Sequence, residues 1–172
     1  MYIIKEVLKG VMVMDKNMKS TLIKANDVFS RISSVFMEII RLEIERIGVY
    51  NLTAAQYIIL QHLGNDRIPV GDLSLRSSYF GTNISYNVRK MVENEYIIQE
   101  KSQHDQRTHY VSISPKSKEL IAKIDQALDE HGDLLHKYGI DRKYFEEILS
   151  SIGKVDDFWT YTLSSRYRGS GR

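Results

Sequence analysis

Apolar residues recur at helical spacing through most of the chain. The first such stretch covers residues 22–48, where Gly48 stands just past the expected helix end. Its apolar stripe consists of Leu22, Phe29, Ile32, Phe36, Ile39, Ile40 and Ile47. Thr53 and Gln56 then have the spacing of a capping box, so a short second helix is predicted from Thr53 to Gly64.

Residues 70–101 are predicted to contain two more short helices, after a turn at Pro69. The second of these is the clearer one, because four apolar residues at helical spacing share one face. They are Ile84, Val88, Met91 and Val92. The other face is polar and consists mostly of Thr82, Asn83, Tyr86 and Lys90.

The pattern changes to alternation at the end of a polar stretch, residues 102–107. His109, Val111 and Ile113 would face one way, with Tyr110 and Ser112 facing the other, which is typical of a strand. We therefore predict a β-hairpin whose strands pack on the helices and whose polar tip lies outside any core.

Helical spacing returns after the hairpin. Ser114 and Pro115 suit the start of one helix, and Asp141 suits the start of another. The predicted order is therefore a long helix, three short helices, a hairpin and two longer helices. Three helices followed by a hairpin form a winged helix-turn-helix, so the predicted fold is mainly α with a small β-hairpin wing.

Composition narrows the classes of function. The 172 residues include no cysteine, which excludes disulfides, thiolate metal sites and thiol redox switches. No apolar run is long enough to span a membrane and the N-terminus does not read as a signal peptide, so a cytoplasmic protein is expected.

Because the sequence has no glycine-rich phosphate loop and no Gly-x-Ser-x-Gly elbow, we predict no enzyme activity and no cofactor. His131 and His136 do not share a helix face, so no metal site is predicted.

The polar face near residues 82–90 suits the major groove of DNA, which admits an α-helix. Its predicted DNA contacts hydrogen-bond or carry positive charge: Thr82, Asn83, Ser85, Tyr86, Asn87, Arg89 and Lys90. At the hairpin tip, the Asp105 carboxylate would fix the turn by accepting backbone or guanidinium hydrogen bonds, and Arg107 would reach DNA. A solvated surface helix with an inert hairpin is the simpler alternative. Charge does not decide between them, because residues 65–116 hold seven Lys/Arg and six Asp/Glu.

The sequence resembles the MarR family of bacterial transcriptional regulators from about residue 20 to residue 163. The most specific part is the hairpin, where the family pattern is Asp-x-Arg, three residues, then Val-x-Leu-Thr. The stretch "DQRTHYVSIS" has Asp105, Arg107 and Val111 in place, with Ile113 for Leu and Ser114 for Thr. The stretch "NISYNVRKMVENEYI" is similar to the family's recognition helix.

The sequence also departs from the family pattern. Tyr86 stands where the family usually has Arg, and Arg89 stands where it often has Asp. Asn94 and Glu95 replace the usual glycine before the strand, and Ser117 replaces a glycine after Pro-Lys. These departures concern the DNA sequence that is read more than the fold.

The resemblance implies an obligate homodimer that binds a pseudo-palindromic DNA operator. Residues 51–115 would form the DNA-binding lobe, and residues 20–50 with 116–163 a helical dimerisation region. Residues 1–19 would be an N-terminal arm or extra helix, and residues 164–172 a mobile tail.

A small aromatic or phenolic effector is also implied, in a cleft beside the lobe. Its candidate residues are Met37, Arg41, Ile58, Gln61 and His62. Arg41 is singled out because a partly buried cation could hold a phenolate or a carboxylate. Two alternatives stay open: these residues could only pack the junction, and the lobe could bind a protein instead of DNA.

Overall fold

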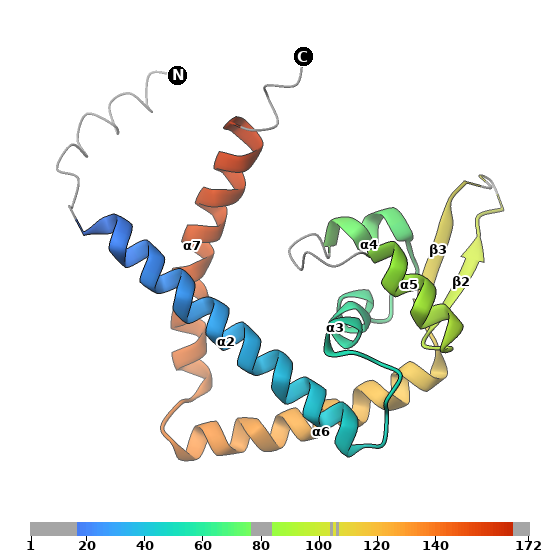
Figure 1. Ribbon diagram of the computed structural model, residues 1–172, viewed down its shortest axis with the longest axis horizontal. Helices are drawn as coiled ribbons and strands as arrows, with labels where there is room; N and C mark the ends of the chain where they lie inside the picture. Colours follow the sequence, from blue (N-terminus) through green and yellow to red (C-terminus); the bar gives the residue numbers. More distant parts are fainter. Residues whose placement is uncertain (1–16, 77–83, 104, 106, 167–172) are drawn as a thin grey trace. The chain divides into compact units, whose positions relative to one another are not determined.

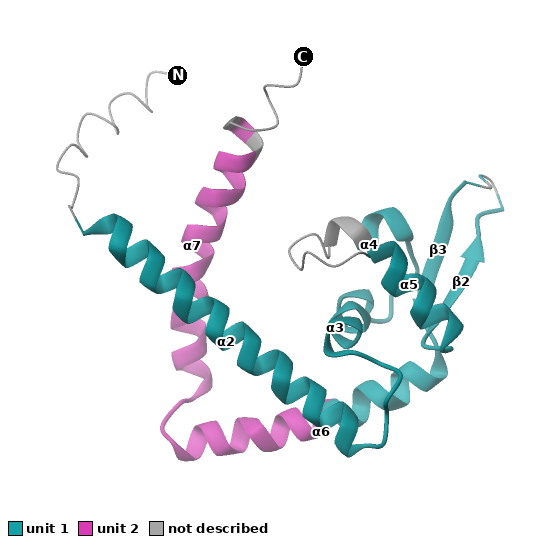
Figure 2. Cartoon of the chain, in the orientation of Figure 1, with its two compact units in different colours: residues 1–124 teal, residues 125–172 magenta. Residues whose placement is uncertain are grey.

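Two compact units make up the computed structural model, which describes residues 17–76, 84–103, 105 and 107–166 (Figure 1). Residues 1–124 belong to the first unit and residues 125–172 to the second (Figure 2). Thr82 and Asn83, two of the predicted DNA contacts, lie outside the described residues.

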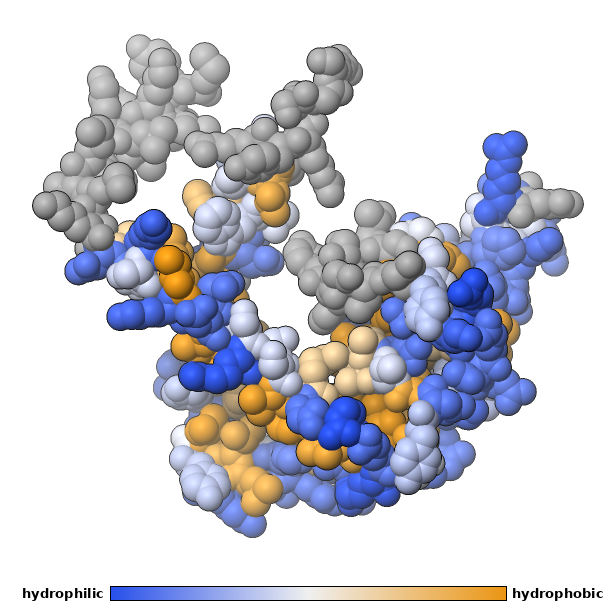
Figure 3. Space-filling model, viewed as in Figure 1, coloured by the Kyte–Doolittle hydropathy of each residue, from blue (hydrophilic) through white to orange (hydrophobic). Residues whose placement is uncertain are grey.

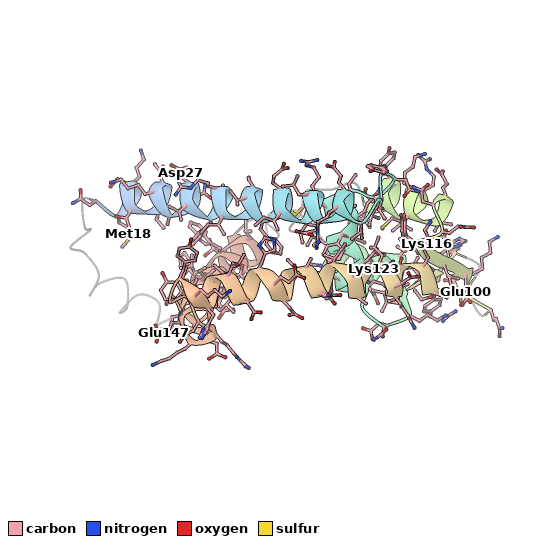
Figure 4. All side chains as sticks on the ribbon, turned by 90° about the horizontal axis from the view of Figure 1, so that it is seen from below. Met18, Asp27, Glu100, Lys116, Lys123 and Glu147 are labelled. Carbon is pink, nitrogen blue, oxygen red and sulfur yellow. The ribbon has the colours of Figure 1, made fainter. Side chains whose placement is uncertain are left out.

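The first helix, α2 (Met18–Arg46), is long and has one apolar face. It begins before the predicted stripe and ends just before Gly48, whose φ of +78° favours glycine. Met18 and Asp27 project from opposite sides of α2 (Figure 4). Ile40 and Ile44 are fully buried near its C-terminal end, where α2 packs on the next helix.

The second helix, α3 (Ala54–Leu63), begins and ends where the sequence predicts. The backbone N–H of Gln56 donates to Thr53 Oγ1 over 3.2 Å, and the Thr53 N–H donates to Gln56 Oε1 over 3.0 Å. The predicted capping box is therefore confirmed. Tyr57, Leu60 and Leu63 on α3 are buried, so this helix lies at the centre of the core of the first unit.

Two short helices follow, α4 (Val70–Arg76) and α5 (Ile84–Glu93). On α5 the residues Ile84, Val88 and Met91 are buried and Val92 is half-buried, which confirms the predicted apolar face. This face packs on α4 and on the sheet, so the opposite face of α5 is turned to solvent.

The sheet has three antiparallel strands in the order β1-β3-β2, where β1 is Ile68–Pro69, β2 is Ile97–Lys101 and β3 is His109–Ile113. The strands β2 and β3 form the predicted hairpin, with Ile97 opposite Ile113 and Lys101 opposite His109. The strand β1 was not predicted, since Pro69 was expected only to mark a turn. Proline is tolerated there because β1 is an edge strand.

The turn between α5 and β2 has a left-handed residue where the family has glycine. Glu95 has a φ of +63°, which is costly for a residue with a Cβ. The surrounding hydrogen bonds hold this turn in place: Ser114 Oγ donates to the Glu95 carbonyl over 2.7 Å, and Ser117 Oγ donates to the Tyr96 carbonyl over 2.5 Å. Ser117, the other departure from a family glycine, therefore stabilises the same turn.

The last two helices are α6 (Pro115–Lys137) and α7 (Arg142–Arg166). The N–H of Ser117 donates to Ser114 Oγ, and the N–H of Tyr144 donates to Asp141 Oδ1 over 2.9 Å, so both predicted helix starts are capped. Within the second unit most large apolar side chains are exposed, and Leu149 on α7 is 66% exposed. Among the described residues, none of the helices has the length and apolar character needed to cross a membrane.

Candidate nucleic-acid interface

The outward face of α5 carries most of the predicted DNA contacts that the structure describes. Ser85, Tyr86 and Arg89 are exposed and Lys90 is half-buried, whereas Val88 and Met91 are buried. The guanidinium carbon of Arg89 lies 5.7 Å from the centroid of the Tyr86 ring. At this distance a guanidinium is attracted by an aromatic face, so Tyr86 helps to orient Arg89.

A carboxylate that the sequence analysis did not single out lies on the same face. Glu93 Oε2 is 2.6 Å from Lys90 Nζ, and Glu93 Oε1 is 3.8 Å from Arg89 Nε. The hydrogen bond from Lys90 lowers the pKa of Glu93, and the same bond raises the pKa of Lys90. Both groups therefore stay charged over the neutral range.

Asn87 faces inward more than predicted. Its Oδ1 accepts a hydrogen bond from Gln56 Nε2 over 3.2 Å, and its side chain is half-buried. This bond ties α5 to the N-terminal turn of α3. Asn87 thus has a role in holding α5 against α3, and its contact with DNA stays a prediction.

The tip of the hairpin is organised by Asp105. Its Oδ1 accepts from the N–H of Arg107 over 2.9 Å, and its Oδ2 accepts from Thr108 Oγ1 over 3.0 Å. The N–H of Thr108 also donates to the Asp105 carbonyl, and the Arg107 hydrogen bond lowers the pKa of the Asp105 carboxyl. The carboxylate was predicted to accept from the backbone or from a guanidinium, and the structure has the backbone bond. The guanidinium of Arg107 is exposed and makes no ion pair with another described residue.

A groove of about 640 Å³ joins these two parts of the first unit. Arg89 and Ser85 line it from α5, Arg107 and His109 line it from the hairpin, and Pro69 lines it from β1. Two arginines from different elements therefore border one depression, whose lining also includes the apolar residues Val70 and Val88. Two arginines at one groove can attract an anionic ligand such as a nucleic-acid backbone.

The edge strand and the hairpin are joined by a second arginine network. The Arg67 guanidinium carbon is 4.1 Å from the centroid of the Tyr110 ring, and Arg67 Nε is 2.9 Å from Glu100 Oε2. Arg67 precedes β1, while its two partners lie opposite each other on β3 and β2. The network therefore connects the residue just before β1 to both strands of the hairpin. Sequence reasoning missed it because β1 was not predicted.

The five effector candidates all lie in the first unit, but one prediction about them is wrong. Arg41 is exposed rather than partly buried, and its guanidinium pairs with Glu38 over 2.7 Å and with Glu45. The cause is local, since these glutamates lie three residues before and four residues after Arg41 on the same face of α2. Their hydrogen bonds raise the pKa of Arg41.

The other four candidates are placed as follows. Met37, Ile58 and His62 are half-buried, and Gln61 is exposed and donates to Tyr57 Oη. None of these residues lines the groove between α5 and the hairpin.

Comparison with known sequences gives two matches. The sequence model of the family described as "Transcriptional regulator SarA/Rot" matches residues 45–124. The "Exopolysaccharide II synthesis transcriptional activator ExpG" of Rhizobium meliloti (strain 1021) is 30% identical over 132 residues, which are 77% of this chain and 68% of that protein. Both matches include the lobe and the hairpin.

Comparison with solved structures gives the same fold. A MarR transcriptional regulator from Methanosarcina mazei Go1 has a TM-score of 0.63 at 20% identity, covering 80% of this chain and 97% of that one. The complex of Staphylococcus aureus MepR with DNA has a TM-score of 0.64 at 16% identity, covering 77% and 96%. Staphylococcus aureus MarR in complex with salicylate and kanamycin has a TM-score of 0.66 at 16% identity, covering 83% and 94%. The predicted winged helix-turn-helix fold is confirmed.

Proposed function

Because this chain belongs to the MarR family of winged helix-turn-helix transcriptional regulators, we propose that it binds a pseudo-palindromic DNA operator as a homodimer. The chain is a transcriptional regulator and not an enzyme. In a two-fold dimer the two α5 helices would enter the major groove about one helical turn apart, roughly 10 bp. The symmetry of the operator would follow from the symmetry of the protein.

The groove between α5 and the hairpin carries this proposal. It brings Arg89 and Arg107 to one depression, although they lie on different elements. Arg89 and Lys90 on α5 would contact phosphates, and Ser85 and Tyr86 would contact base edges or phosphates. Arg107 would reach the minor groove beside the site, where negative potential is concentrated.

The apolar face of α2 supports the dimer. Ile32 is 60% exposed and Val35 is 55% exposed in the single chain, and apolar side chains appear at the surface over α2 in Figure 3. A row of large apolar residues of this length is costly to leave in water, so a second copy is expected to cover it. The same reasoning applies separately to α7, where Leu149 and Phe158 are exposed.

DNA selection with the purified protein tests the proposal directly. Binding should enrich a site with two inverted half-sites, and its affinity should fall steeply with salt because phosphate contacts release counterions. Sedimentation of the same protein should give the mass of two chains. A salt-independent affinity, or enrichment of no sequence, would contradict the proposal.

A reversible small-molecule effector is the expected control, since the chain has no cysteine for a thiol switch. Aromatic carboxylates are the first class to screen, because a relative of the same fold was solved with salicylate. The residues to follow are Met37, Ile58 and His62, which are half-buried in the first unit. Operator release on addition of the compound, with no change after mild peroxide, is the expected result.

The balanced charge of residues 65–116 favours a second candidate, a winged-helix module that binds a protein through its hairpin. Seven cations against six anions give these residues a much smaller positive charge than is typical of a DNA-binding module. A protein partner that is lost on Arg107→Ala, together with no shift of any duplex at low salt, would identify this candidate as the correct one.

A further inference from the structure

The carboxylate of Glu93 lies among the cations of the outward face of α5. It is within ion-pair distance of Lys90, at 2.6 Å, and of Arg89, at 3.8 Å. The side chains of Glu93, Arg89 and Lys90 are 49%, 67% and 41% exposed, so all three are open to solvent and to a ligand. We call these three residues the α5 ion cluster.

The stability of the helix gives little reason for this carboxylate. Glu93 is the last residue of α5, where the helix dipole disfavours negative charge. The cations precede the glutamate in the chain, which is the weaker order for pairs three or four residues apart. Exposed pairs of this kind contribute little to folding. The α5 ion cluster therefore affects the binding of an anionic ligand to Lys90 and Arg89 more than it affects the stability of the helix.

We infer that Glu93 competes with DNA phosphate for Lys90 and Arg89, and so limits the affinity of this regulator for DNA of any sequence. The inference rests on the proposed function. Before DNA binds, the carboxylate occupies the position of a phosphate and reduces the charge of the cluster from two cations to a net single positive charge. When a phosphate takes its place, Glu93 returns to solvent and attracts a cation of its own.

This competition has a thermodynamic signature. Binding affinity falls with salt in proportion to the counterions released from DNA. If Glu93 takes up a cation as Lys90 turns to the phosphate, the net release is smaller and the salt dependence is shallower. Weaker phosphate binding also reduces the occupancy of the many competing sites in a genome, so that base contacts decide where the protein stays.

Glu93→Gln tests the inference, because glutamine has nearly the same size but no charge. The full-length variant and wild type would be titrated against a labelled duplex of random sequence and against the selected operator at several salt concentrations. We expect the variant to bind both duplexes about twofold to fivefold more tightly for each recognition helix. The slope of log affinity against log salt should become steeper by about 1 for each Lys90 released.

A matched control separates local competition from net charge. Glu119 on α6 pairs with Lys123 over 2.8 Å, four residues apart, and Lys123 is labelled in Figure 4. Glu119→Gln removes the same charge from a similar exposed pair outside the recognition helix. The expected affinity of this control is that of wild type. Equal tightening by both variants would overturn the inference.

A double-mutant cycle with Lys90→Gln identifies the partner. Without Lys90 the gain in DNA affinity from Glu93→Gln should fall to the part that comes from Arg89 alone.

If wild type binds DNA but Glu93→Gln binds equally or more weakly, Glu93 orients the cations and does not compete, and the inference alone fails. If wild type binds no duplex, the proposed function fails and the inference fails with it. Equal thermal unfolding of the variants serves as the control for folding.

Discussion

The winged lobe and the long helices differ in how far their apolar residues are buried. In the lobe, Leu60 and Val111 are fully buried within one chain. On α2, Ile32 is 60% exposed, and on α7, Leu149 is 66% exposed. The lobe thus has a core of its own, whereas the long helices carry apolar faces that one chain leaves open. The lobe is therefore packed within one chain, and the open faces of α2 and α7 are where the proposed second copy would bind.

A charge on the open face of α2 should have the largest effect. Ile32→Asp would bury one unpaired carboxylate from each chain in a two-fold interface, at a cost of about 3–5 kcal/mol each. We expect dissociation to monomers at micromolar concentration and loss of operator binding, measured by sedimentation and by DNA titration. Ser30→Asp, on the polar face of the same helix, is the control and should remain dimeric. A dimeric Ile32→Asp protein would show that this face of α2 is not the interface.

A cavity in the lobe should lower the free energy of unfolding of the lobe itself, without acting on the dimer interface. Leu60→Ala removes a side chain with 0% exposure from α3, which costs about 2–5 kcal/mol of unfolding free energy. The loss, measured by urea unfolding, should be the same at all protein concentrations if the lobe unfolds independently of the dimer. A loss that depends on concentration would mean that the lobe and the interface unfold together.

A substitution at the wing should change DNA binding without changing the stability of the fold. Arg107→Ala should weaken operator binding by about 1–3 kcal/mol for each contact, while thermal unfolding stays that of wild type. Arg107→Lys should recover only part of the loss, because lysine keeps the charge but not the planar fork of donors. The neighbouring exposed residue Gln103 gives a control, since Gln103→Ala should bind normally. Normal binding by Arg107→Ala would make the wing a purely structural hairpin.

The sequence was sufficient to predict the elements whose signals are local. The capping box at Thr53 and the turn fixed by Asp105 follow from residues two to three apart, and the structure has both. The strand β1 was missed because two residues that include Pro69 have no alternation to detect. Pairing across the sheet, as between Arg67 and Glu100, depends on that strand and was missed with it.

Ion pairs within single helices are the other features that differ from the prediction. The three- and four-residue spacings that pair Arg41 with Glu38 and Glu45 are visible in the sequence, and so are those of Glu93. In both places the cation was a predicted ligand contact, and the carboxylate that pairs with it was not predicted. An anion three or four residues from a cation on one helix is therefore the local signal that predicts such pairs.

The smallest expected effect is the acid response of the wing turn. The hydrogen bonds from the Arg107 N–H and the Thr108 hydroxyl hold the pKa of Asp105 below its ordinary value of 3.8. A carboxyl with a lowered pKa stabilises the folded turn fully above its unfolded pKa, and this contribution is lost as the pH falls through the lower, folded value. The amide resonances of Arg107 and Thr108 should therefore stay constant from neutral pH down to about pH 4 and then shift with a midpoint below 3.8. Asp105→Asn should remove this transition, because the amide does not titrate, while the lobe remains folded. A midpoint at or above 3.8 in the wild-type protein would show that the carboxylate does not hold the turn, and that Arg107 must be positioned by the strands alone.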